Sequence, residues 1–428
     1  MIAATASPLP ARTVPTRAVA AWILYDLANT IFSMGVVSMY FSLYVRDAVG
    51  ADRADSLYSL IFAVSMGLIF VVSPLLGAMT DRAPRRMPFL VATTVTCCVI
   101  TSLFARGPFA LSAVLFILAN AAYQAGVQFY DALLPEVTTP ENRGRIGGLG
   151  IGIGYLGSYI AVGLGFIPHV SYATLFTLIA IAFCIFALPC FFFVAERGNP
   201  RARRVFSLDA IRDSTRDTVR TLRSGREHPG LLRFLLGRLF YTDAINTVIA
   251  YMTLYAVNVS VASGLTEAAG MAKAKLVMFS AITCAIAGGI IWGYVVDRRG
   301  PKKTLTRVMQ LWVVTFSLGA AVGFWHLPIA WLFVVACLSG IAIGGTWTAD
   351  RPLMLRLTPP DRVGEFYGLY GMVGRFSAIT GPVLWGLTTR IASARGASIL
   401  TGEALAIVML LLMVIAGMVI LRPVTDVR

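Results

Sequence analysis

The sequence predicts an all-α integral membrane protein in which twelve transmembrane helices form two pseudo-symmetric six-helix bundles. Three observations support this prediction: long apolar runs, an uneven distribution of Lys and Arg, and internal repeats. Of the 428 residues, 57% are hydrophobic and only 13% are charged, whereas a soluble domain carries roughly 25% charged residues. This composition excludes a soluble enzyme, a disordered protein and a disulfide scaffold.

The predicted helices follow apolar windows, since a membrane pass needs about 20 predominantly apolar residues. The windows end at Pro, Gly and charge clusters, where helices commonly end. They cover residues 19–45, 56–80, 87–105, 108–134, 145–167, 171–194, 230–260, 272–296, 303–324, 328–355, 364–389 and 400–421. The predicted regions are an N-terminal tail (1–18), a first bundle (19–194), a linker (195–229), a second bundle (230–421) and a C-terminal tail (422–428).

The distribution of Lys and Arg predicts the orientation of the chain. If both termini lie on one side, the loops on that side hold 24 of the 36 Lys and Arg residues, and the opposite loops hold seven. Cytoplasmic loops carry such an excess. We therefore expect a multi-pass protein of the cytoplasmic (inner) membrane with both termini in the cytoplasm. The net charge of +15 then indicates membrane topology, and no nucleic-acid partner is expected.

The linker contains a segment, 207–222, in which apolar residues recur at helical spacing between Asp and Arg. Ser207 is a suitable N-cap for a helix. Two interpretations remain open: an amphipathic helix on the cytoplasmic membrane surface, or a solvated linker helix.

Three motifs recur at one period of 216 to 220 residues, each in the equivalent pass of its half. Parallel repeats of this kind are typical of secondary transporters, whose solute sites lie between the halves. The pairs are Asp26-x-x-Asn29 with Asp243-x-x-Asn246, Gly77-x-x-x-Asp81-Arg82 with Gly293-x-x-x-Asp297-Arg298, and Pro140, Gly144, Gly148 and Leu149 with Pro360, Gly364, Gly368 and Leu369.

The motifs that begin at Gly77 and Gly293 fall in loops between passes, and we interpret them as gating loops. Glycine lets a neighbouring helix approach closely. Aspartate can cap a helix N-terminus across an interface and can pair with arginine. Such contacts would hold one side shut and break when the halves move. The Gly-x-x-x-Asp-Arg pattern resembles the cytoplasmic loop signature of the major facilitator superfamily.

Asp26 and Asn29 lie on one face of the first pass, because they are separated by three residues. A carboxylate inside a span costs about 2.5–3.5 kcal/mol on insertion scales, so it is expected to face a wet interior and to mark a functional site. Asp243 and Asn246 repeat the pattern in pass seven. The alternative is a structural role near the helix end, for instance a pair between Asp243 and Arg238.

Pass four carries a polar stripe of Asn120, Gln124, Gln128 and Asp131, which share one helix face. A stripe of this length is expected to line a cavity rather than to face lipid. Interhelical hydrogen bonding is the alternative, and it explains one or two such residues better than four.

Three further charged residues lie within the second bundle. By the repeat, Arg351 stands at the position of Asp131, so it is expected either to pair with Asp131 across the halves or to pair locally with Asp350. Arg375 lies about ten residues into pass eleven, where a lone arginine is costly. We expect it to bind a carboxylate or phosphate of a solute, in preference to pairing with Asp243 or Asp350.

The sequence offers little for catalysis. The three histidines, His169, His228 and His326, lie at loop ends or in the linker. No nucleophile elbow, phosphate loop or metal-ligand pattern is present. We therefore expect no enzyme activity, no catalytic residue, no metal and no cofactor.

Several motifs together resemble the vacuole-effluxer-like family. They span roughly residues 20–390 and include Tyr25-Asp26-x-Ala28-Asn29-Thr30, Leu134-Pro135-Glu136, Arg143-Gly144-Arg145, Glu365-Phe366-Tyr367-Gly368 and Arg375-Phe376-Ser377. This family is a branch of the major facilitator superfamily that includes a fungal autophagy-related vacuolar amino-acid exporter. The chain departs from the family at Leu27, Asp131 and Arg375, where Trp, Asn and often Lys are usual. The carboxylate at Asp131 resembles the cation-coupling carboxylates of the glycoside–cation symporter branch.

The residues and the resemblance together predict a monomeric secondary active transporter that works by alternating access. Its expected solute is small and polar, an amino acid or a similar organic anion or zwitterion, with transport coupled to a proton or another cation. Asp26 and Asp131 are the predicted coupling residues, because a carboxyl group in an apolar cavity can exchange protons near neutral pH. Arg351 and Arg375 are the predicted anion ligands. A cation-coupled sugar or glycoside symporter and a multidrug-type effluxer are the alternatives.

Overall fold

The computed structural model describes residues 14–199, 202, 229–359, 362–377 and 380–425. Throughout these ranges the regular structure is helical, and the predicted all-α class is confirmed. The predicted segment 207–222 lies outside the described residues, as does most of the N-terminal tail.

The N-terminal half, up to residue 194, contains six predicted passes. The first is a continuous helix with a π-helical middle segment, and the fifth is interrupted after Gly154. The elements are α1 (Thr16–Phe32), η1 (Ser33–Tyr40), α2 (Phe41–Val49), α3 (Ala51–Arg82), α4 (Met87–Ser102), α5 (Phe109–Ala132), the one-turn α6 (Leu134–Val137), α7 (Arg143–Gly154), α8 (Leu156–Leu164) and α9 (Tyr172–Phe193).

The C-terminal half, from residue 229, repeats this order, and its fifth pass again consists of two helices. Its elements are α11 (Pro229–Ala262), α12 (Glu267–Arg299), α13 (Pro301–Phe324), α14 (Ala330–Leu357), α15 (Val363–Phe376), α16 (Thr380–Ala394) and α17 (Ile399–Leu421). Each of the twelve predicted segments therefore contains one or more of these helical elements, and the first pass begins three residues earlier than predicted.

Local sequence signals set several helix ends. The side chains of Ser171, Thr266 and Ser398 accept hydrogen bonds from backbone N–H groups three residues later, at the starts of α9, α12 and α17; such caps satisfy donors that have no intrahelical partner. Gly300, at φ +83°, separates α12 from α13, and Pro301 begins α13, where its fixed φ suits a first helical turn.

Nine of the described helices are long and apolar enough to cross a membrane, and the bent helix α3 makes a tenth if it counts as one span. Large apolar side chains on the outside of the molecule, such as Val71, Phe192 and Leu412, are 74%, 78% and 60% exposed. An exterior of this kind suits hydrocarbon, because in water so much exposed apolar surface would favour association.

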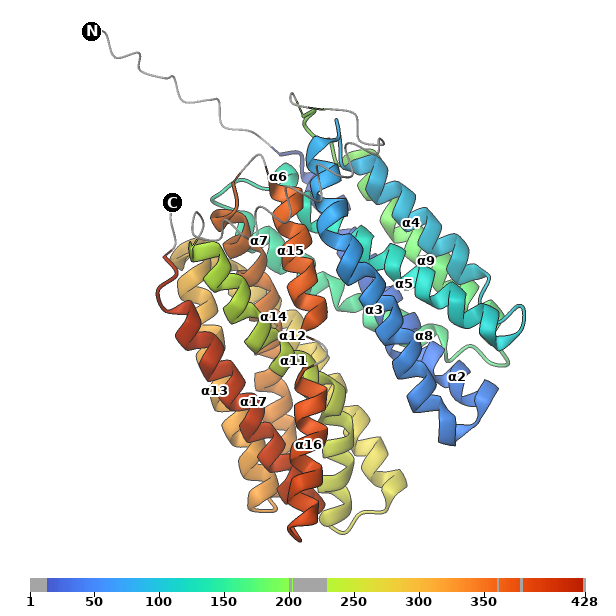
Figure 1. Ribbon diagram of the computed structural model, residues 1–428, viewed down its shortest axis with the longest axis vertical. Coiled ribbons are helices and arrows are strands. Elements are labelled where there is room, and N and C mark those ends of the chain that lie inside the picture. The colour runs from blue at the N-terminus through green and yellow to red at the C-terminus, as the bar shows by residue number, and fades with distance from the viewer. Residues whose placement is uncertain (1–13, 200–201, 203–228, 360–361, 378–379, 426–428) are drawn as a thin grey trace.

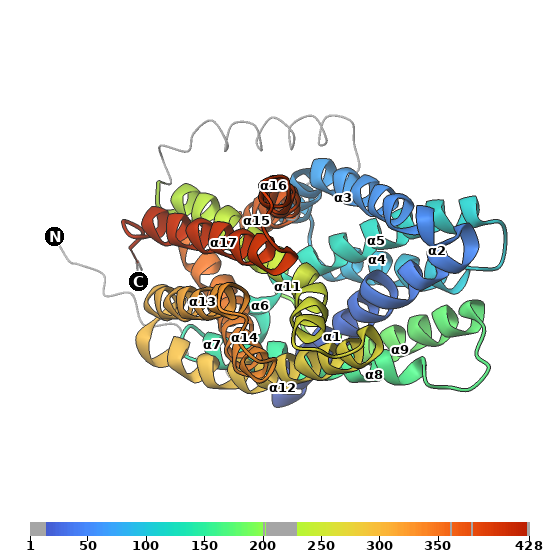
Figure 2. The ribbon, with the colours of Figure 1, turned by 90° about the horizontal axis from the view of Figure 1, so that it is seen from below.

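The two halves lie side by side (Figure 1), and the end-on view separates α3, α4, α5 and α9 from α11 to α17 (Figure 2). Between the halves, α15 packs along α3, and α12 packs along α7. Glycines permit this approach. A Cβ atom on Gly77 would lie 2.2 Å from the carbonyl oxygen of Gly364, and one on Gly148 would lie 2.3 Å from that of Gly289. Any larger side chain there would push the halves apart.

Candidate solute site and gating contacts

Asp81, at the end of α3, caps a helix of the other half. Its carboxylate oxygens accept hydrogen bonds from the backbone N–H groups of Gly364 and Glu365, both at 2.7 Å. These groups belong to the first turn of α15, which lacks intrahelical partners and carries the positive end of the helix dipole. Arg86 forms a 2.8 Å ion pair with Asp81.

Asp297, at the end of α12, makes the equivalent contact in the opposite direction. It accepts hydrogen bonds from the N–H groups of Gly144, at 2.6 Å, and Arg145, at 2.9 Å, in the first turn of α7. Gly293 lies one turn earlier and is buried against the Gly144 carbonyl, whereas Arg298 is exposed. The predicted helix-capping contact is thus present twice, and we call the face that carries Asp81 and Asp297 the clamp face.

Arg351 of α14 faces two carboxylates from the other half, and we call Asp26, Asp131 and Arg351 the central triad. The Nε atom of Arg351 lies 3.1 Å from an oxygen of Asp131, and an Nη atom lies 3.7 Å from an oxygen of Asp26. Both aspartates are 6% exposed. Of the two pairings that the sequence left open for Arg351, the one across the halves is present.

The hydrogen bonding of the central triad is incomplete. Nη1 of Arg351 is buried and has no hydrogen-bond partner. Oδ1 of Asp131 is the oxygen that faces Nε of Arg351 at 3.1 Å, and this ion pair lacks hydrogen-bond geometry. Beside them, Tyr130 stacks on Trp22 at 4.6 Å and on Tyr25 at 4.9 Å between ring centroids. The triad therefore combines three ionisable groups, an aromatic wall and unused hydrogen-bonding capacity, which are properties expected of a solute site rather than of a structural ion pair.

Asp350, the residue before Arg351, belongs to a different group, which we call the closed cluster: Arg238, Tyr241, Asp350 and Tyr370. Asp350 is fully buried and accepts from Arg238 at 2.8 Å, from Tyr370 at 2.8 Å and from the hydroxyl of Tyr241. The Arg238 guanidinium also lies 3.6 Å from the ring centroid of Tyr370. All four residues come from the C-terminal half, and the sequence analysis missed the two tyrosines because they lie on other helices.

Arg375 pairs with neither Asp243 nor Asp350. Instead it donates to the hydroxyl of Ser73 at 2.7 Å and to the backbone carbonyl of Gln124 at 2.9 Å, both in the N-terminal half. Its Nε atom is buried without a partner. Arg375 therefore bridges the halves, although through neutral groups rather than carboxylates.

The prediction that the whole polar stripe of α5 lines a cavity is wrong for two of its members. Asn120 donates to Ser65 of α3 at 2.7 Å, and Gln128 bonds both the carbonyl and the hydroxyl of Ser73. Interhelical hydrogen bonds satisfy both ends of the Gln128 amide and the nitrogen of Asn120, whereas Oδ1 of Asn120 is buried without a partner. Gln124 is half-buried, and Asp131 is the member that reaches the triad.

The two copies of the Asp-x-x-Asn motif differ in their contacts. Asp243 accepts a 2.9 Å hydrogen bond from the backbone N–H of Gly381, near the start of α16. Asp243 therefore has the structural role that was the alternative interpretation, but it caps a helix and does not pair with Arg238. Asn246 is half-buried, whereas Oδ1 of Asn29 is buried and has no partner.

The chain after α9 adds contacts to the clamp face that the sequence did not indicate. One oxygen of Glu196 accepts from the N–H groups of Arg86, at 2.6 Å, and Met87, at 2.9 Å, where α4 begins. Burial raises the pKa of Glu196, and these two donors oppose the rise. Asn199 donates to the backbone carbonyl of Asp81 at 2.6 Å, so this segment secures the loop that positions the clamp.

Among the described residues, no three His, Cys, Asp or Glu side chains gather in a way that could hold a metal ion. The fold is that of the major facilitator superfamily. The chain overlays the human organic anion transporter MFSD10 (TETRAN) with a TM-score of 0.68 at 16% identity, covering 95% of this chain and 100% of that one. The proton:xylose symporter XylE gives a TM-score of 0.68 at 13% identity, covering 96% and 95% of the two chains.

The particular family follows from the sequence match. The model of the vacuole effluxer Atg22-like family matches residues 48–424, and the chain belongs to this family. An uncharacterized MFS-type transporter of Bacillus subtilis, YxiO, is 23% identical over 426 residues, which cover 94% of this chain and 93% of the relative. This is a family of transporters and not of enzymes, so the protein moves a small solute across a membrane in which it is embedded by multiple passes.

Proposed function

We propose that the protein is a proton-coupled secondary transporter for a small organic solute that carries a carboxylate, either an organic anion or a zwitterion such as an amino acid. The central triad is the observation that carries this proposal. One arginine of the C-terminal half faces two aspartates of the N-terminal half, and its Nη1 has no hydrogen-bond partner.

The triad couples a proton to an anion through competition for Arg351. While both aspartates are ionised, they satisfy the charge of the guanidinium. Protonation of Asp131 or Asp26 removes one competing charge, and a solute carboxylate can then take its place, since guanidinium binds carboxylates through two parallel hydrogen bonds. Binding of the proton therefore favours binding of the anion, and loss of the proton favours its release.

Alternating access moves the two halves about this site. The capping contacts of Asp81 and Asp297 and the hydrogen bonds of Arg375 cross between the halves, so they break when the clamp face opens. The excess of Lys and Arg in the loops on this side supports a cytoplasmic clamp face. In this proposal the protein works as a monomer in the cytoplasmic membrane, and the described conformation is closed toward the cytoplasm.

Neutral amino acids and organic acids are first screened for compounds that raise the Tm of the purified protein. Labelled forms of these compounds are then used in transport assays with the protein in proteoliposomes. Asp26→Asn and Asp131→Asn should abolish accumulation driven by a pH gradient but leave counterflow exchange intact, because exchange needs no net proton movement. Asp47→Asn is the matched control, since Asp47 is exposed and its carboxylate accepts a hydrogen bond from the Tyr172 hydroxyl, away from the central triad.

If both variants concentrate the solute as the wild type does, the coupling assignment is wrong. Stabilisation by uncharged sugars together with no response to any carboxylate would instead favour the cation-coupled glycoside symporter. Arg351 would then have no anion to bind, and the proposed role of the triad would be overturned.

A further inference from the structure

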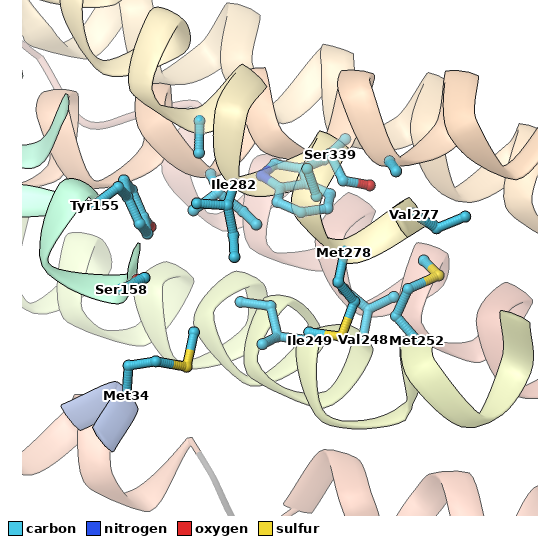
Figure 3. A pocket seen from close by; sticks show the side chains of 15 residues that line it. Met34, Tyr155, Ser158, Val248, Ile249, Met252, Val277, Met278, Ile282 and Ser339 are labelled. Carbon is cyan, nitrogen blue, oxygen red and sulfur yellow. The ribbon is translucent and has the colours of Figure 1, made fainter. Parts of the chain in front are cut away.

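A cavity lies between the halves, bounded by α11, α12, α13 and α14 on one side and by η1 and the α7–α8 junction on the other (Figure 3). Its volume is about 150 Å³, and most of its lining side chains are apolar. An enclosed apolar cavity of roughly this size can hold a benzene molecule. The cavity therefore suits an apolar group of a ligand better than it suits water.

The lining favours an aromatic ring over an alkyl chain. Met34, Met252 and Met278 reach the cavity from three different elements, η1, α11 and α12, and the rings of Tyr155 and Trp312 also line it. In Figure 3, Met34 lies across the cavity from Met252 and Met278. Thioether sulfurs make favourable contacts with aromatic rings, and flexible methionine side chains adapt to the shape of a ligand.

Ser339 supplies an independent indication of a ligand. Its side chain lines the cavity (Figure 3), the residue is 6% exposed, and its hydroxyl oxygen is buried without a hydrogen-bond partner. A buried hydroxyl without a partner costs free energy that a partner would recover. A polar substituent on a bound ring is such a partner.

The cavity adjoins the central triad. Gly154, which precedes the lining residue Tyr155, lies directly against Asp26: a Cβ atom placed there would be 3.3 Å from an oxygen of its carboxylate. Met34 follows Asp26 by eight residues in the same pass, which is about 12 Å along a helix axis. A single solute of moderate length can therefore reach both sites.

We infer that this cavity, which we call the ring pocket, binds an aromatic ring of the transported solute while Arg351 holds its carboxylate. The solute class is then an aromatic carboxylate with a short spacer between ring and carboxylate. The carboxylate anchor rests on the proposed function, whereas the ring pocket stands on its own lining, volume and unpartnered hydroxyl.

The test measures binding of three probes to the purified full-length chain by calorimetry: 5-phenylpentanoate, pentanoate and phenol. Ile249 lines the ring pocket and is 42% exposed, so Ile249→Trp fills the pocket without forcing a ring into the packed interior. Ile249→Leu is the volume-matched control. Wild type and control should bind 5-phenylpentanoate about tenfold to a hundredfold more tightly than pentanoate, because burial of the ring adds to the affinity.

Ile249→Trp should abolish both this preference and phenol binding. Ser339→Ala is a second variant that leaves the pocket open; it should weaken phenol several-fold and leave the preference for the phenyl compound in place. A wild type that binds both carboxylates without preferring the phenyl compound, or an Ile249→Trp variant that retains the preference, would overturn the ring pocket. Phenol binding that Ile249→Trp removes, without binding of either carboxylate, would support the pocket and overturn the carboxylate anchor.

Discussion

Asp350 and Arg351 are adjacent on α14, yet they take part in two charge clusters of opposite character. Asp350 lies in the closed cluster, where Arg238 and two tyrosine hydroxyls satisfy it within the C-terminal half. Arg351 reaches across the interface to Asp26 and Asp131 and retains an unpartnered Nη1. The difference separates contacts that keep one half rigid from contacts that must change when the halves move.

A buried ion pair inside one half can persist through every conformation, so complete hydrogen bonding there carries no functional cost. A fully satisfied cluster between the halves would instead hold one conformation. The clamp contacts are intermediate between these two cases: they cross between the halves, but each aspartate is bound through backbone N–H groups. These helix termini can be solvated again when they separate.

The largest expected effect is on folding, at the closed cluster. Asp350→Ala leaves the Arg238 charge buried and unpaired, which should cost about 3–5 kcal/mol and lower the apparent Tm in detergent by roughly 6–10 °C. The double variant Arg238→Met with Asp350→Leu should recover most of this loss, because it removes both charges.

The apparent Tm of both variants is measured by thermal unfolding, monitored by fluorescence-detected size-exclusion chromatography. Asp131→Asn is the comparison from the central triad and should cost less, because its ion pair is already incomplete. Equal losses for Asp350→Ala and Asp131→Asn would remove the distinction between the two clusters.

The next effect concerns the equilibrium between conformations rather than folding. Asp297→Asn weakens the charge-assisted cap on α7 and should shift the balance toward an open clamp face by about 1 kcal/mol, or roughly fivefold, with little change in Tm. Spin labels on the clamp-face ends of α7 and α12 would report the shift as a larger population at long distance.

Arg298→Gln is the matched control, because Arg298 is adjacent but exposed. Asp81→Asn should act in the same direction through the second clamp. If neither aspartate variant alters the distance distribution, the clamps do not contribute to closing this face.

The smallest expected effect is at Glu196, which accepts hydrogen bonds from Arg86 and Met87 of the N-terminal half. Burial raises its pKa above the ordinary glutamate value, so the folded state binds the proton more tightly than the unfolded state. The contribution of Glu196 to the free energy of unfolding is therefore fully present below the ordinary glutamate pKa. It is lost as the pH rises through the raised pKa.

Glu196→Gln keeps an acceptor for the α4 N-terminus and removes the charge. It should flatten the pH dependence of Tm in this acidic range by an amount equivalent to about 0.3 kcal/mol, since solvent screens a half-buried group. Melting curves at closely spaced pH values test this. A variant whose profile is steeper than that of the wild type would contradict the expected sign.

Much of the fold was predictable, because the apolar windows and the repeat reflect local constraints. A span must be apolar along its length, and a duplicated motif must occupy the equivalent helix, so the helices and the two clamp aspartates could be located from residue order. The same local logic identified Asp26, Asp131 and Arg351 as costly charges within spans.

The partners of those charges could not be assigned in the same way. Arg375 was expected to face a solute or a carboxylate but binds Ser73 and the Gln124 carbonyl, and Asn120 and Gln128 were expected in a cavity but bond α3. A helix face can be read from spacing, whereas the helix opposite that face depends on the packing of all the others.

The sequence by itself determined that this protein spans a membrane in two related halves with costly charges inside them, because hydropathy and repetition are properties of residue order. Only the tertiary structure decided that Arg351 meets two aspartates across the interface while Asp350 is enclosed within one half. Those pairings depend on the rotation and approach of distant helices, which glycines such as Gly148 permit but which no local pattern encodes.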